Sequence, residues 1–287
     1  MTQSAAPSGG DVAAALDRVL ALRGVADAVA AAREACTELR WHPALRRRAA
    51  EARAEATIRA ARCSAALDGA RLPVDAVRDA ARGAITFPDD PSGRLVHGAW
   101  RALAEAHHVE AALGRAPLQA LARLHVAAAA GLVPEEALGR PRREDETPGD
   151  GAAVGPAPHG DELSARLGVL TAVLRAPSSA PALVVAAVAH AEVVTARPFL
   201  AGNGVVARAL ARAVVVGRGL DPTGVAVWEA GHLSAGPRYA TTLAGYASGT
   251  PDGVAAWIRH CAEAMVQGVT EGRMLCNAVL TGRPGTE

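Results

Sequence analysis

The residues best suited to chemistry in this chain lie in one short stretch, Arg197 to Arg208, which reads Arg-Pro-Phe-Leu-Ala-Gly-Asn-Gly-Val-Val-Ala-Arg. Gly202, Asn203 and Gly204 open a predicted helix, where glycine permits a tight turn and the first backbone N–H groups lack partners inside the helix. Those amides and the helix dipole favour a bound anion. Arg208 lies about one turn further on, and helical side chains lean toward the N-terminus, so its guanidinium reaches the same anion. The stretch therefore predicts a phosphate-binding site.

A plainer interpretation of the same residues stays open. A Gly-rich turn that only connects two core helices has the same composition. In that case Arg208 lies on the surface and binds nothing.

The stretch resembles the Fic motif, His-Pro-Phe-x-Asp/Glu-Gly-Asn-Gly-Arg-x-x-Arg. Pro198, Phe199, Gly202 to Gly204 and Arg208 match in register, and His190 stands seven residues before Arg197, where Fic proteins often carry another His. The pairs Arg238-Tyr239 and Trp257-Ile258 loosely resemble features of later Fic helices. The resemblance covers residues 50–265. It implies the Fic/Fido (Fic-Doc) family, a Fic-type helical domain, and transfer of AMP from ATP to a protein hydroxyl.

A second segment, Ser64 to Gly69, resembles the inhibitory motif of the same family, Ser/Thr-x-x-x-Glu-Gly/Asn, with Asp68 in place of Glu. The resemblance implies two partners for Arg208, namely the γ-phosphate of a nucleotide and the carboxylate of Asp68. Because Asp is one methylene shorter than Glu, it stays open whether Asp68 reaches Arg208. The alternative is an ordinary helix end at Gly69 with Asp68 exposed.

Three positions depart from the Fic motif. Arg197 replaces the His that acts as general base, and a guanidinium stays protonated at physiological pH, so it cannot accept a proton. Ala201 replaces the Asp or Glu that holds Mg²⁺, so we expect no metal ligand there. Val205 replaces the first motif Arg, which removes one phosphate contact. Arg197 either adds positive charge beside the anion site or points to solvent, and the sequence does not decide between the two.

These substitutions leave three hypotheses for the function. The first is a pseudoenzyme that binds ATP, another nucleotide or phosphate without turnover. The second is a protein AMP-transferase (adenylyltransferase) with an altered mechanism, in which Arg197 stabilises charge on the phosphate. The third is a protein-interaction scaffold without a small ligand. By the resemblance, residues 141–160 would dock a segment of a target protein.

The elements that must position these residues are all predicted to be helices, so the expected fold class is all-α. Apolar residues recur at helical spacing through Asp11–Cys36, with a break near Gly24, and through Ala44–Leu67. Residues 134–161, rich in Pro, Gly and charge, are predicted to form a mobile loop. We divide the chain into a disordered tail (1–10), an N-terminal helical region with the inhibitory-like helix (11–94), a Fic-like core (95–280) and a second tail (281–287).

Composition excludes several classes of function. The formal net charge is +1 and every basic residue is Arg, so nothing draws the whole chain to nucleic acid or to a membrane surface. The four cysteines form no C-x-x-C pair, which argues against zinc and for reduced thiols. The longest apolar run, Pro181–Ala189, is shorter than the ~20 residues of a membrane-spanning helix. We therefore expect a cytoplasmic protein without a membrane or nucleic-acid partner.

Overall fold

A computed structural model describes residues 9–150, 154–177 and 179–282 of the chain. Within these ranges no β-strand forms, and the one bridge recorded is isolated, between Ala130 and Val133. The helices are α1 (Gly9–Leu20), α2 (Val25–Arg40), α3 (Ala44–Arg47), α4 (Ala49–Leu67), α5 (Val74–Ala81), α6 (Pro91–Val109), α7 (Pro117–Ala129), α8 (Gly160–Leu174), α9 (Ala182–Ala196), α10 (Asn203–Gly217), α11 (Trp228–Ser234), α12 (Pro237–Ala247) and α13 (Pro251–Leu280), with 3₁₀ turns η1 (Glu110–Ala112) and η2 (Glu135–Ala137). The all-α prediction is confirmed.

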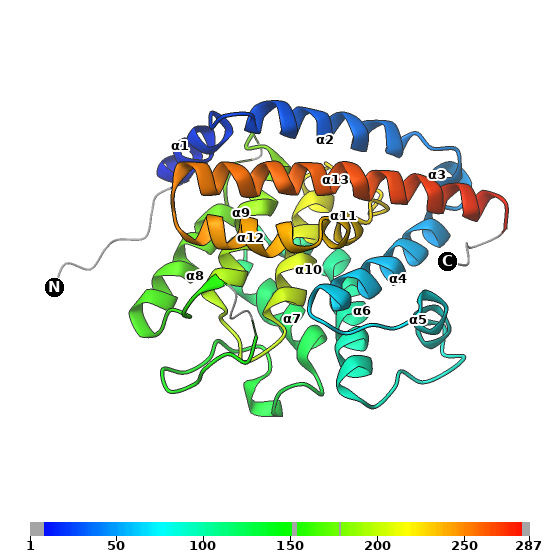
Figure 1. Ribbon diagram of the computed structural model, residues 1–287, viewed down its shortest axis with the longest axis horizontal. Helices are drawn as coiled ribbons and strands as arrows, with labels where there is room; N and C mark the ends of the chain where they lie inside the picture. The colour runs from blue at the N-terminus through cyan, green and yellow to red at the C-terminus, as the bar shows by residue number, and fades with distance from the viewer. Residues whose placement is uncertain (1–8, 151–153, 178, 283–287) are drawn as a thin grey trace.

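Helices α9 and α10 lie at the centre of the molecule (Figure 1). Every residue of α9 from Leu183 to Ala196 is buried, as expected for a helix that is apolar on nearly all sides. Most of α10 is buried too, and it packs directly against α9. Residues 197–202 join the two helices, so the candidate residues lie on a connection whose ends are both fixed in the core.

The other helices surround this pair. Helices α2 and α13 run side by side along one edge, and α11 and α12 pack against α13 (Figure 1). Helix α4 packs on α6 and α11, and it also contacts α10. Because of this last contact, the C-terminal end of α4, where Asp68 follows Leu67, lies close to the start of α10.

The N-terminal region differs from the sequence prediction at one boundary and agrees at another. Gly9 and Gly10 lie within the predicted tail of residues 1–10, but in the structure they belong to α1. Asp11 in the first turn of α1 is a favourable partner for the helix dipole. Residues 1–8 of that tail lie outside the described ranges. The predicted break near Gly24 is confirmed, because Gly24 has a φ of 71° between α1 and α2.

The single helix predicted for Ala44–Leu67 is divided in two. Arg48 leaves the helical region, with a φ of −129° and a ψ of 31°, and so separates α3 from α4. Its guanidinium donates to the carbonyl of Val279 and to the carboxylate of Glu51. These contacts to α13 and α4 account for a break that local helix preference does not predict.

The segment predicted to be a mobile loop, 134–161, is irregular apart from η2 and the first residues of α8. Its described residues are nevertheless held to the core. The backbone N–H of Arg142 donates to the carbonyl of Pro198 at 2.7 Å, and that of Gly149 donates to the carbonyl of Leu200 at 2.8 Å. Residues 151–153 lie outside the described ranges. The part of the segment from Arg142 to Gly149 therefore lies beside the connection between α9 and α10.

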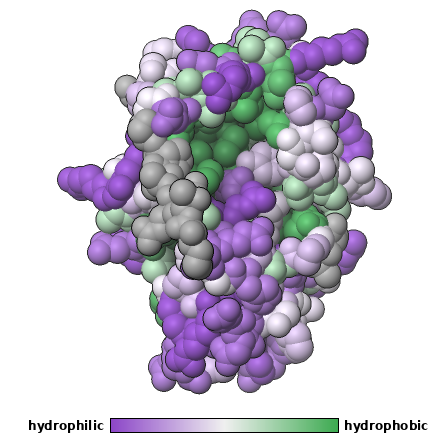
Figure 2. All heavy atoms as spheres, turned by 90° about the vertical axis from the view of Figure 1, so that its left-hand side faces the viewer, coloured by the Kyte–Doolittle hydropathy of each residue, from purple (hydrophilic) through white to green (hydrophobic). Residues whose placement is uncertain are grey.

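The surface on the α8 side is mostly hydrophilic around its edge, while apolar side chains gather in a hollow in the upper part of the same face (Figure 2). Across the described ranges, no helix combines the length and the apolarity that crossing a lipid bilayer requires.

Close packing of α11 on α13 gives a test of the fold. A β-carbon added at Gly231 would lie 2.0 Å from the carbonyl oxygen of Ala264. Gly231→Ala should therefore lower the free energy of unfolding by about 1–3 kcal/mol or more, measured by urea denaturation, because backbone atoms must move apart.

Gly168, on α8, is the matched control for that substitution. It has no heavy atom within 4 Å of the site of an added β-carbon. Gly168→Ala should raise the free energy of unfolding by about 0.5–1 kcal/mol, through helix preference alone. Equal stabilities of the two variants would contradict the close crossing of α11 and α13.

Candidate anion-binding site

The connection between α9 and α10 is made rigid by the side chain of Asn203. Its Oδ1 accepts a hydrogen bond from the backbone N–H of Phe199 at 3.0 Å, and its Nδ2 donates to the carbonyl of Phe199 at 2.9 Å. The ring of Phe199 stacks on His125 of α7, with centroids 3.8 Å apart and planes 5° from parallel. Asn203 is thus a structural clamp as well as the first residue of α10.

Arg197 ends α9 in a left-handed conformation, with a φ of 43°. No other non-glycine residue in the described ranges has a positive φ, and such a conformation costs about 1–2 kcal/mol. Its carbonyl accepts a hydrogen bond from the Arg142 guanidinium at 2.8 Å. The residue is only 4% exposed, so of the two orientations considered above, the one toward solvent is wrong. Burial lowers the pKa of Arg197, and the nearby charge of Asp150 opposes that shift.

Arg208 is a buried charge with three partner residues, two at the end of α4 and one on α12. Its Nε donates to Oγ of Ser64 at 2.8 Å, and its Nη2 donates to the carbonyl of Ser64 at 2.9 Å. Nη2 also donates to the carboxylate of Asp68 at 2.6 Å. Nη1 donates to the hydroxyl of Tyr239 at 3.2 Å. Burial alone would lower the pKa of Arg208, but Asp68 and Tyr239 raise it overall. Arg208 is therefore not the exposed residue of a simple connector.

Asp68 joins the end of α4 to the start of α10. Gly69, with a φ of 92°, ends α4 in a Schellman motif, in which the N–H of Gly69 bonds to Ala66 and the N–H of Ala70 bonds to Ala65. The helix end that the sequence suggested is thus present, and Asp68 also reaches Arg208. A β-carbon at Gly204 would lie 2.7 Å from Oδ1 of Asp68, so glycine at this position is what lets the carboxylate approach α10.

A second carboxylate, from Asp150, lies on the N-terminus of α10. Its Oδ2 accepts the backbone N–H of Asn203 at 2.8 Å, and its Oδ1 accepts Nδ2 of the same residue at 2.7 Å. Burial raises the pKa of Asp150 and Asp68 adds to the shift, against hydrogen bonds from Asn203 and Gly202 that lower it. Sequence reasoning missed Asp150, because no spacing rule links it to a residue 53 positions later.

These groups line one cavity of about 600 Å³. The lining includes the candidate residues Arg197, Ala201, Gly202, Asn203, Gly204, Arg208 and Asp68, together with Asp150. Ser64 lies behind Arg208, and Val205 is fully buried without lining the cavity. The volume is in the range of ordinary small-ligand sites. Helix amides and a guanidinium therefore face the same space, although two carboxylates of the protein now contact them.

Tyr239, which accepts from Arg208, belongs to a buried aromatic cluster. The ring Nε2 of His190 lies 2.8 Å from the hydroxyl of Tyr239, and His232 is stacked between Trp228 and Trp257. Burial lowers the pKa values of His190 and His232 well below the usual range, so both rings stay neutral. His232 is thus a core residue.

The described residues contain no group of three or more His, Cys, Asp or Glu side chains placed to hold a metal ion. Asp68 and Asp150 are the two carboxylates that line the cavity, and each is already bonded to the protein.

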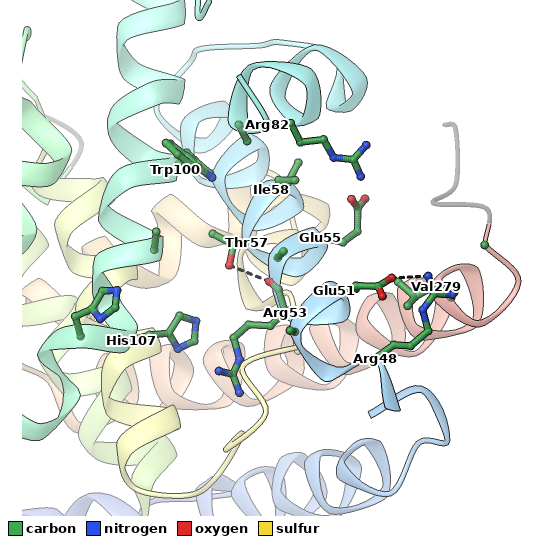
Figure 3. A pocket seen from close by; sticks show the side chains of 16 residues that line it. Arg48, Glu51, Arg53, Glu55, Thr57, Ile58, Arg82, Trp100, His107 and Val279 are labelled. Atoms are coloured by element: carbon green, nitrogen blue, oxygen red, sulfur yellow. Dashed lines mark hydrogen bonds and ion pairs between the residues drawn. The ribbon is translucent and has the colours of Figure 1, made fainter. Parts of the chain in front are cut away.

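A second cavity, of about 700 Å³, is lined mainly by residues of α4 and α6, with a few from the ends of α5 and α13 (Figure 3). Trp100, Arg53 and His107 are among its lining side chains, but neither the Gly-Asn-Gly turn nor Arg208 contributes to it. Arg53 already donates to the carbonyl of Thr223 at 2.9 Å, and burial lowers the pKa of His107 to about 4. His107 therefore adds no positive charge to this cavity near neutral pH, and one donor of Arg53 is already used within the protein.

Comparisons with known proteins agree with the fold and the motif. Residues 115–215 match the family model of the Fic/DOC family. A Fic family protein from Desulfovibrio desulfuricans G20 is 20% identical, with a TM-score of 0.66 over 91% of this chain and 75% of that one. Fic-1 (residues 134–508) from C. elegans is 18% identical, with a TM-score of 0.62 over 94% of this chain and 74% of that one. A search of curated proteins gives no match.

The two tyrosines of the chain provide a matched test of the site. Tyr239→Phe removes a hydroxyl shared by two buried groups, Arg208 and His190. Tyr246→Phe removes a hydroxyl that donates to Glu192 at 2.7 Å, but Glu192 keeps Arg166 as a partner. Tyr239→Phe should lower the free energy of unfolding by about 1–3 kcal/mol, and by more than Tyr246→Phe, in urea denaturation. The reverse order would show that Tyr239 does not hold Arg208.

Proposed function

We propose that this chain, whose residues 115–215 match the family model of the Fic/DOC family, is a pseudoenzyme that binds a nucleotide or another phosphate-bearing ligand without turning it over. The observation that carries the proposal is the pairing of two anion-binding groups in one cavity. The N-terminus of α10 at Gly202–Gly204 and the guanidinium of Arg208 both face it. A helix N-terminus beside an arginine is a well-suited site for phosphate.

Loss of catalysis follows from what lines the same cavity. Arg197 occupies the position at which the family resemblance places a general base, and its guanidinium carries no lone pair for a proton while it stays charged. Proton transfer to a positioned base typically contributes 10²–10⁴-fold to a rate, so about that factor is missing. Arg197 instead adds positive charge, which favours binding of a phosphate over reaction at it.

We expect nucleotide binding to depend little on Mg²⁺, because of Ala201. The methyl group at this position gives no oxygen to a hard cation. We therefore propose that ATP or another nucleotide binds chiefly through the amides of α10 and Arg208. Docking of a protein target at residues 141–160 remains a prediction of the family resemblance. In this structure two backbone amides of that segment bond to Pro198 and Leu200.

Calorimetric titration with ATP, with and without Mg²⁺, tests the proposal. The wild-type chain should bind ATP with little dependence on Mg²⁺, and labelled ATP should transfer no label to protein. Arg208→Ala should weaken binding by about 1.5–3 kcal/mol, because a hydrogen bond to a charged group is lost. Arg218→Ala is the control, since Arg218 at the other end of α10 bonds to carbonyls of residues 174–177 and does not line the cavity.

Two results would contradict the proposal in different ways. If the correctly folded wild-type chain binds no ATP at millimolar concentration, the hypothesis of a protein-interaction scaffold without a small ligand is favoured. Transfer of label that disappears in Asn203→Ala would favour the altered transferase.

Asp68 gives a prediction in the opposite direction. Its carboxylate lies 2.6 Å from Nη2 of Arg208, with 29% of the Asp68 side chain exposed. Since the same guanidinium would bind a phosphate, Asp68→Ala should strengthen ATP binding by about tenfold, in line with a charged hydrogen bond that no longer competes. Asp75→Ala, at an exposed carboxylate on α5, is the control and should leave binding unchanged. Weaker binding by Asp68→Ala would show that Asp68 supports the ligand rather than competing with it.

A further inference from the structure

Asp150 is a carboxylate brought to the N-terminus of α10 by a distant part of the chain. Both of its oxygens are used, one on the backbone N–H of Asn203 at 2.8 Å and the other on Nδ2 of Asn203 at 2.7 Å. A carboxylate that accepts two parallel hydrogen bonds at a helix N-terminus presents the same charge and nearly the same donor pattern as two oxygens of a phosphate. The protein thus supplies an anion of its own at the site that we assign to a ligand.

The segment that carries Asp150 fixes where the carboxylate lies. Gly149, the preceding residue, bonds through its N–H to the carbonyl of Leu200 at 2.8 Å. Arg142, eight residues before Asp150, is only 5% exposed. Its backbone N–H donates to the carbonyl of Pro198, and its guanidinium donates to the carbonyl of Arg197. These contacts hold 142–150 along the connection between α9 and α10. The hydrogen bonds of Arg142 and Gly149 therefore fix the position of the Asp150 carboxylate at the N-terminus of α10.

The contact has opposing contributions. Asp150 loses solvation on burial, and Asp68 places a second negative charge in the same cavity. Both raise the pKa of Asp150, although its hydrogen bonds to Asn203 and Gly202 act the other way. Burial and the charge of Asp68 therefore both disfavour the charged form of this partly buried carboxylate. A phosphate-bearing ligand that also reaches Arg208 adds a charge-assisted hydrogen bond to the guanidinium, and this contact favours the ligand over the carboxylate in competition for these donors.

We propose that Asp150 is a built-in competitor for the ligand phosphate: its carboxylate occupies the amides at the start of α10, and a phosphate-bearing ligand binds there only when the carboxylate withdraws. The inference rests on the proposed function, since it concerns the same site, and it identifies residues 142–150 as the element that regulates access. Asp68 blocks the guanidinium of Arg208, whereas Asp150 blocks the helix amides, so the two carboxylates act on separate halves of the site.

Calorimetric titration with inorganic pyrophosphate, followed by ATP, tests the competition on the full chain. Asp150→Ala should bind pyrophosphate about tenfold to a hundredfold more tightly than the wild type, because a charged competitor for two donors is removed. Asp150→Asn, which keeps the shape but not the charge, should show a smaller gain. Asp145→Ala removes an equal charge from an exposed position in the same segment and should bind as the wild type does.

The outcomes separate this inference from the proposed function. If wild type and Asp145→Ala bind either ligand but Asp150→Ala binds no more tightly, the competition is wrong and the phosphate site stands. If Asp150→Ala loses Mg²⁺-dependent binding that the wild type has, Asp150 is a cation ligand and the inference is overturned. If no correctly folded variant binds pyrophosphate or ATP, the phosphate site itself is wrong and the competition falls with it.

A measurement without ligand checks the contact directly. In Asp150→Ala the amide of Asn203 should exchange with deuterium faster than in Asp145→Ala, because its acceptor is gone. Unchanged exchange at Asn203 would overturn the inference even if ligand binding changed.

Discussion

A guanidinium placed in the interior of a protein must be surrounded by hydrogen-bond acceptors, and that requirement at Arg208 organises the rest of the site. With its side chain 1% exposed, Arg208 takes acceptors from Ser64 and Asp68 at the end of α4 and from Tyr239 on α12. Two elements that are far apart in sequence, α4 and α12, are thereby tied to one position on α10. The cavity owes its shape to this convergence, and the charge that would bind a ligand is the same charge that holds the helices in place.

The connection between α9 and α10 also contains buried polar groups that need hydrogen-bond partners, and here they are backbone groups. Asn203 bonds to both the N–H and the carbonyl of Phe199, and Arg142 binds the carbonyl of Arg197. Because these polar groups are buried, each needs a partner, and the partners come from side chains rather than from regular structure. The left-handed backbone of Arg197 is maintained by this surrounding network. The groups that we propose to bind phosphate are thus held in position by contacts within the protein.

How much of this could be predicted depends on how local each interaction is. The Gly-Asn-Gly turn and Arg208 lie within one helical turn of each other, so spacing alone brought them together. The contact between Asp68 and Arg208 spans 140 positions, and only the resemblance to a known motif indicated it. The contact of Asp150 with Asn203 has neither a local pattern nor a motif. The interruption of the helix at Arg48 also has no local pattern, because it depends on a contact of Arg48 with the distant helix α13.

The balance of charge around the cavity has a consequence for how fast a ligand arrives. Among the described residues that line it, Arg197 and Arg208 are matched by Asp68 and Asp150. Opposite charges at such short range leave almost no field at a distance, and the chain as a whole carries a formal charge of only +1. An approaching polyanion is therefore not steered from bulk solvent, and its encounter rate should resemble that of a neutral pair and vary little with ionic strength.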